Sequence, residues 1–173
     1  IDKTTVRNDH GVWRIPGSRS SSKAWRDWKR WGHGPVDVTK AIEESVDSFF
    51  YQTAFDLGID RISTWMNRFG FGEPTGIDIY EECNANMPTR EWKMSRYRTP
   101  WYQGDTVPIG IGQGYWTATP MQLAKATSVL INHGKVMPPH ILKATLSHGD
   151  DFERQTQTRI EPQVSITEVP DKV

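Results

Sequence analysis

The chain has 173 residues, and its 21 basic and 21 acidic side chains give a formal net charge of zero with histidine neutral. This length is enough to bury a sizeable core, and the balanced charge argues against a dedicated nucleic-acid binder. No apolar run approaches the ~20 residues that a transmembrane helix needs. The single cysteine, Cys83, excludes an internal disulfide framework and a zinc ribbon. Because the chain opens on Ile1, we expect it to be a portion of a longer protein.

Charged residues are unevenly distributed. Residues 1–34 carry eight basic and three acidic side chains, a net charge of +5, whereas residues 43–82 carry two basic and nine acidic ones, a net charge of −7. Such asymmetry either steers an anionic ligand or pairs one surface with another, and solvated faces with internal ion pairs are the commoner outcome.

The first helix is expected after a loop-rich opening, residues 1–36, which shows no sustained period. From Thr39, apolar residues recur at spacings of three and four until Gly58, which predicts an amphipathic helix. Ser45 and Asp47 both favour caps and turns. The segment is therefore either one helix or two helices that meet at a corner.

Two further helices are predicted from their end signals. The first begins at Asp60, which can cap it, and ends at Gly70. The second begins after Thr119, with proline in the first helical position and glutamine in the third, and runs to Gly134. These residues together predict a capping box.

The remaining segments are less regular. Residues 71–118 contain many Gly, Pro and Thr and are expected to form loops with short extended pieces. Residues 141–146 are expected to form a strand, and residues 149–173 are polar, without periodicity, and are expected to be mobile.

Two short patterns do not carry the chemistry that they suggest. The glycines of 110–114 do not form a dinucleotide fingerprint, because Pro108 interrupts the preceding strand and the next helix begins too late. Ser20 and Lys23 match Ser-x-x-Lys, in which a desolvated lysine one helical turn away deprotonates the serine. They lie in a polar loop without an apolar stripe, so Lys23 is expected to stay solvated and charged, and the pair is not expected to be catalytic.

Ser45-Val46-Asp47 places a hydroxyl and a carboxylate at the break between helical segments. Their apolar neighbours Ile42, Phe49 and Phe50 are expected to be buried, which would hold the two polar groups in place. The simpler interpretation is a helix junction in which the serine and the aspartate serve only as caps.

Several ordered segments together resemble the transpeptidase domain of class B penicillin-binding proteins, and within that family the elongation-specific enzymes of Gram-negative bacteria. The resemblance extends over residues 5–146. The segments that carry it are Trp25–Gly34, Ala41–Gln52, Phe69–Gly72 with Thr75–Asp78, Met87–Lys93, Trp101–Asp105 and Gly110–Gln122.

The resemblance implies an α+β domain, with an antiparallel sheet flanked by helices, of which the chain is an internal portion. We expect a basic loop-rich segment at 1–36, helices around the Ser-x-Asp motif at 37–146, and a polar excursion at 147–173. Of the three family motifs, Ser-x-x-Lys, Ser-x-Asn/Asp and Lys-Thr/Ser-Gly, only the second is present in its expected context.

By the same resemblance, Ser45 and Asp47 are the catalytic residues of this chain. Ser45 would relay a proton between the lysine base and the amine during acyl transfer. Asp47 would hold that lysine and orient the stem peptide. The nucleophile and the oxyanion-hole donors would lie elsewhere in the longer protein, and no cofactor is required.

The resemblance also implies a candidate zinc site, because some members of the subfamily hold zinc with Asp, Asp, His and Cys. Asp9, Asp27 and His33 stand at three of these positions, and Val46 stands at the cysteine position. Since structural zinc prefers four ligands, and Cys83 is distant in sequence, we expect little zinc binding.

The implied parent enzyme cross-links peptidoglycan stem peptides during cell elongation on the periplasmic side of the inner membrane. Its expected partners are stem peptides, β-lactams and a membrane glycan polymerase, and no nucleic acid. An alternative function uses the eight tryptophans. Trp25, Trp28 and Trp31 either stack on sugars, which would make the chain a carbohydrate-binding module, or simply pack a core, and the basic opening could make the chain a protein-interaction module.

Overall fold

The computed structural model describes residues 1–142 and 164–165. The chain divides into two compact units, the first formed by residues 1–63 and 88–117 and the second by residues 64–87 and 118–173. Each unit is described by itself. Within the described residues, no helix is both long and apolar enough to cross a membrane.

Four short strands lie in the opening segment of the first unit. β1 (Arg7–Asp9) pairs antiparallel with β4 (Gly34–Val36), and β2 (Val12–Trp13) pairs antiparallel with β3 (Trp25–Arg26). The loop-rich segment expected over 1–36 therefore also contains four short strands, which the sequence analysis did not predict. Strands of two or three residues are too short to produce a recognisable alternation in the sequence.

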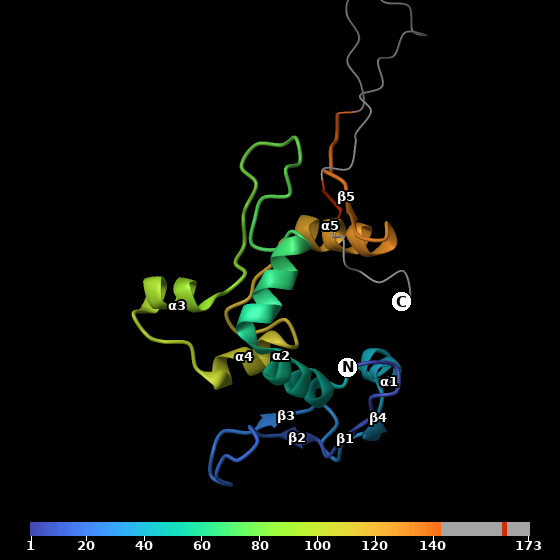
Figure 1. The fold of residues 1–173 in the computed structure, drawn as a ribbon, viewed down its shortest axis with the longest axis vertical. Helices are drawn as coiled ribbons and strands as arrows, with labels where there is room; N and C mark the ends of the chain where they lie inside the picture. The colour runs from blue at the N-terminus through green and yellow to red at the C-terminus, as the bar shows by residue number, and fades with distance from the viewer. Residues whose placement is uncertain (143–163, 166–173) are drawn as a thin grey trace, which may run out of the picture. The chain divides into compact units, whose positions relative to one another are not determined.

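The helical segment after β4 divides in two, as the second of the two sequence interpretations proposed. α1 (Val38–Glu43) ends before Ser45, and α2 (Asp47–Arg68) begins directly after the corner. α2 is itself kinked at Gly58, whose φ of 74° and ψ of 159° are not helical, so the predicted helix end and the next helix start both lie at this kink. Figure 1 shows both strand pairs beside α1 and the first half of α2.

Two helices of the first unit were missed by the sequence analysis, which expected loops with short extended pieces over 71–118. α3 (Arg90–Tyr97) is capped by the Thr89 side chain, which accepts a hydrogen bond from the amide of Trp92. α4 (Gln103–Ile109) contains Pro108 near its end. The Thr89 cap was the available signal for α3, whereas the proline and the shortness of α4 hid that helix.

Two small clusters of buried side chains form the core of the first unit. One joins β4 and α1 to the start of α2, and the other joins β3, α2 and α4; their buried members are Val36, Ala41, Val46 and Phe49, and Trp25, Tyr51 and Val107. Phe49 and Phe50 pack as expected, but Ile42 is 69% exposed, so its predicted burial was wrong. The α1 face that enters this cluster is marked by Ala41.

The second unit is built around α5 (Pro120–Ile131), whose predicted capping box is present: the Thr119 and Gln122 side chains each accept from the other's backbone amide. The fully buried Gln122 side chain also donates to the carbonyls of Glu73 and Asn84, which fastens the preceding loop to the helix. β5 (Lys135–Val136) pairs with β6 (Val164–Ser165). Ile141 and Leu142 are not in a strand, and the rest of the predicted strand at 141–146 lies outside the described residues.

Candidate functional site

Ser45 occupies the corner between α1 and α2 with a left-handed backbone, at φ 52°. The amide of Ser45 donates to the carbonyl of Ile42, and the amide of Val46 donates to the carbonyl of Ala41. This pair of bonds is the Schellman helix ending, and Val46 and Ala41, the two positions that usually make an apolar contact in this motif, belong to the same buried cluster. Glycine is the usual residue at this position because it has no Cβ. A serine here is held against its backbone preference, with its side chain on the exposed surface.

Asp47 opens α2, two residues after Ser45, and is half-buried. Burial raises the pKa of its carboxyl, and the negative charges of Asp27 and Asp9 raise it further, against a smaller opposing effect of His33. The corner therefore presents one exposed hydroxyl beside one carboxylate whose ionisation the fold disfavours.

Replacing Asp47 with asparagine is expected to raise the thermal stability of the isolated 173-residue chain at neutral pH, because this chain lacks the lysine that the resemblance places beside Asp47. A raised folded pKa means that the unfolded chain ionises first as the pH rises, so folding loses free energy. This penalty is absent below about pH 4, near the ordinary pKa of an aspartate, and is complete above the folded pKa. The thermal unfolding midpoints of the wild type and the Asp47→Asn variant should coincide at acid pH, and the midpoint of the variant should be higher at neutral pH. A variant that is less stable than the wild type at neutral pH would contradict the raised pKa of Asp47.

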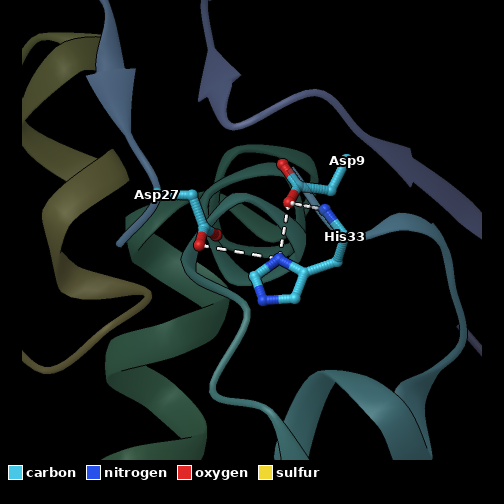
Figure 2. Close-up of side chains that lie close together, drawn as sticks. All are labelled: Asp9, Asp27 and His33. Atoms are coloured by element: carbon cyan, nitrogen blue, oxygen red, sulfur yellow. Dashed lines mark hydrogen bonds and ion pairs between the residues drawn. The ribbon is translucent and has the colours of Figure 1, made fainter. Parts of the chain in front are cut away.

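Asp9, Asp27 and His33 lie together behind this corner, each of them buried, with one potential ligand atom from each within 4.8 Å of the others. Nδ1 of His33 is 2.7 Å from Oδ2 of Asp9 and 3.6 Å from Oδ1 of Asp27. Figure 2 shows the two carboxylates on either side of this nitrogen. The sequence analysis proposed this set of residues, and the fold brings them together.

Backbone amides supply the carboxylates with further donors. The amides of Gly11 and His33 donate to Asp9. Burial alone would raise the pKa of the Asp9 carboxyl, but the hydrogen bonds that it accepts, the one from His33 first, outweigh burial and lower this pKa. Asp27 accepts from the amides of Lys29 and Ser48.

The cluster is attached to both sides of the Ser45 corner. On the α1 side, the indole Nε1–H of Trp28 donates to the carbonyl of Glu44, and the Trp28 ring packs edge-on against His33 at 5.2 Å. On the α2 side, Asp27 accepts from the amide of Ser48. The cluster therefore holds the two helix ends between which Ser45 is exposed. Sequence reasoning missed these roles of Trp28 and Ser48. Both hydrogen bonds use a backbone group, the carbonyl of Glu44 or the amide of Ser48, and a backbone group leaves no pattern in the sequence.

Among the described residues, the group of possible metal ligands at this site consists of Asp9, Asp27 and His33, with no fourth ligand in the group. Val46 is fully buried among aliphatic side chains and offers no lone pair to a metal. Cys83 is exposed and belongs to the second unit. Nδ1 of His33, the ring nitrogen that faces the carboxylates, lies at hydrogen-bond distance from Oδ2 of Asp9.

Other candidates from the sequence are placed apart from this site. Ser20 and Lys23 lie in an exposed, non-helical loop, as expected, and the ammonium of Lys23 lies 5.2 Å from the centroid of the Trp25 ring. Trp25 itself is only 9% exposed and packs in the core, which is the second of the two interpretations of these tryptophans and excludes Trp25 from sugar stacking. Of the other two tryptophans considered for a carbohydrate surface, Trp28 donates a hydrogen bond to the carbonyl of Glu44 and packs against the His33 ring, whereas Trp31 is 84% exposed.

Comparison with known proteins identifies what the chain resembles. Residues 1–169 match the family described as the penicillin binding protein transpeptidase domain. The peptidoglycan D,D-transpeptidase MrdA of Escherichia coli K12 is 58% identical over 149 residues, which are 86% of this chain and 23% of that protein. The chain thus spans less than a quarter of the length of this relative.

Solved structures give the same result. Pseudomonas aeruginosa PBP2, in a complex with WCK 5153, matches with a TM-score of 0.79 and 42% identity over 83% of this chain and 31% of that chain. Helicobacter pylori PBP2, in a complex with MreC, matches with a TM-score of 0.72 and 36% identity over 81% of this chain and 25% of that chain. These agreements confirm the resemblance and the α+β fold class inferred from the ordered motifs.

Proposed function

Since the chain belongs to the penicillin-binding protein transpeptidase family, we propose that the protein containing it cross-links peptidoglycan stem peptides by serine acyl transfer during cell elongation. The observation that carries the proposal is the Ser45 corner: a left-handed serine whose exposed hydroxyl is adjacent to a half-buried carboxylate. A position that usually takes glycine has a serine here, which a purely structural helix ending would not require.

In this proposal, Ser45 relays a proton between a lysine base and the amine of the peptide, and Asp47 holds the lysine and orients the stem-peptide amide. The low ionisation tendency of Asp47 is relieved when a cation docks beside it, since an opposite charge favours the ionised form. The acyl-forming serine, the lysine and the oxyanion-hole donors come from other parts of the longer protein.

A fluorescent penicillin tests this division of roles. The full-length protein is expected to be labelled covalently, because β-lactams acylate the nucleophile of this enzyme class. The isolated 173-residue chain is expected to remain unlabelled, since its one Ser-x-x-Lys pattern lies in an exposed loop. Labelling of the isolated chain that disappears in Ser20→Ala would overturn the proposal.

We also propose that the enzyme needs no zinc. Asp9, Asp27 and His33 are held by one another and by backbone amides, and Val46 stands where a thiolate would close the site. Metal analysis of the purified full-length protein is expected to find far less than one zinc per chain. Val46→Cys is expected to bring the content toward one. Stoichiometric zinc in the protein with valine would contradict this.

The proposed setting follows from the proposed activity. Stem peptides are its substrates and β-lactams its inhibitors, and peptidoglycan cross-linking places it on the periplasmic side of the inner membrane. A membrane glycan polymerase that supplies new strands is the proposed partner. The Helicobacter pylori relative was solved with MreC, which supports an assembly of several proteins. The balanced charge of the chain supports no role in nucleic-acid binding.

A further inference from the structure

We propose that an arginine-lined cavity on the outer side of the β2–β3 pair binds the free carboxylates of an uncross-linked peptidoglycan strand, with Trp31 stacking on the strand. The proposal rests on the function proposed above and adds a second contact point for the substrate. The cavity measures about 450 Å³, and the side chains that matter in it are Arg14, Arg26, Arg30 and Trp31.

The alternation of the strands explains why the arginines gather there. Trp13 and Trp25 are paired across β2 and β3 and both point into the core. Because successive side chains of a strand point to opposite faces, the neighbours Arg14 and Arg26 are on the other face. Both of them line the cavity.

The turn that carries Arg30 and Trp31 is fixed by two close backbone contacts. A Cβ on Gly11 would lie 2.3 Å from the carbonyl oxygen of Arg30, and a Cβ on Gly32 would lie 2.3 Å from the carbonyl oxygen of Asp9. Only glycine allows the two segments to approach this closely. The turn is therefore held against the segment that supplies the Asp9 cluster, and Trp31 is presented from a rigid base.

Within the part of the chain that the structure describes, the three arginines of the cavity form no ion pair. Across residues 1–142, no carboxylate lies within ion-pair distance of Arg14, Arg26 or Arg30. The one acidic group in the lining, Asp27, is buried and already accepts two backbone amides. The guanidinium of Arg30 lies 5.3 Å from the centroid of the exposed Trp31 ring.

This chemistry selects the ligand class. Guanidinium groups form paired hydrogen bonds with carboxylates, and a tryptophan face packs on the apolar face of a sugar ring. An uncross-linked peptidoglycan strand offers both, because its stem peptides end in carboxylates and its backbone is a chain of sugars. An acidic protein partner offers the carboxylates without the sugar face.

The experiment measures the binding of a soluble, uncross-linked peptidoglycan strand to the full-length protein. Arg14→Ser/Arg30→Ser is expected to weaken binding about tenfold or more, since two charged hydrogen-bonding groups are lost. Trp31→Ala is expected to weaken it as well. The matched control is Arg19→Ser/Arg61→Ser, which removes the same charge at exposed positions outside the cavity and should bind as the wild type does.

The same strand with its carboxyl groups amidated separates the two contributions. The amidated strand is expected to bind the wild type more weakly than the native strand does. It should bind the wild type and the Arg14→Ser/Arg30→Ser variant equally. Trp31→Ala should still weaken its binding. Equal binding of native and amidated strands, no effect of the double variant, or no effect of Trp31→Ala would overturn the proposal. Fluorescent penicillin labelling reports the catalytic centre separately: it should be unchanged in every variant, and its loss in the wild type would contradict the proposed function instead.

Discussion

Replacing Ser45 with glycine in the full-length protein is expected to remove transpeptidation while leaving the fold equally stable or more stable. The backbone of Ser45 is left-handed, at φ 52°, and a residue with a Cβ pays for this conformation by about 1 kcal/mol. Glycine relieves that cost and keeps both Schellman hydrogen bonds, which use backbone atoms alone. The hydroxyl that we propose as the proton relay is lost, and such a relay contributes about 10²–10⁴-fold in rate.

Ser45→Ala is the matched control because it removes the hydroxyl and keeps the Cβ. It should lose activity to the same extent without gaining stability. The measurements are the unfolding midpoint and the rate of stem-peptide cross-linking for each variant. A glycine variant that is less stable than the wild type, or one that keeps its activity, would show that Ser45 serves only as a helix ending.

Asp27→Ala is expected to destabilise the protein by about 3–5 kcal/mol, which is typical of breaking a buried charged group's contacts. The carboxylate of Asp27 is fully buried and accepts from the amides of Lys29 and Ser48. Alanine leaves both donors without this partner, and an unsatisfied buried donor is costly. Because the Ser48 amide lies at the start of α2, the loss should also loosen the Ser45 corner.

The comparison is with Arg90→Ala, which breaks the ion pair between Arg90 and Asp60. This pair is exposed on both sides, so its loss should cost about 1 kcal/mol or less. Denaturant unfolding of both variants of the full-length protein gives the two free energies. If Asp27→Ala were as mild as Arg90→Ala, the buried cluster would not be what holds the corner.

Much of the local structure could be predicted because it depends on neighbouring residues. The capping box of α5 needs only Thr119, Pro120 and Gln122, and all three are within four positions. The break at Ser45 was visible for the same reason, since Ser and Asp compete for backbone hydrogen bonds wherever they stand. The sequence alone could also reject Ser20 as a nucleophile, because an exposed polar loop cannot desolvate Lys23.

The resemblance to a family supplied a different kind of information. It placed Asp9, Asp27 and His33 in one group although 24 positions separate the first from the last. No periodicity links these residues, so local reasoning from their spacing could not have joined them. It also identified Val46 as the residue that leaves the zinc ligand set incomplete.

What the sequence by itself determined is the capping box of α5, the possible break at Ser45-Val46-Asp47 and the family. Only the tertiary structure decided that this corner is left-handed at Ser45, that Asp27 and Trp28 hold its two sides, and that short strands place arginines around one cavity. The physical reason is range. Caps and helical periods depend on residues within one or two turns, whereas backbone amides, buried charges and cavity walls meet only when distant segments pack together.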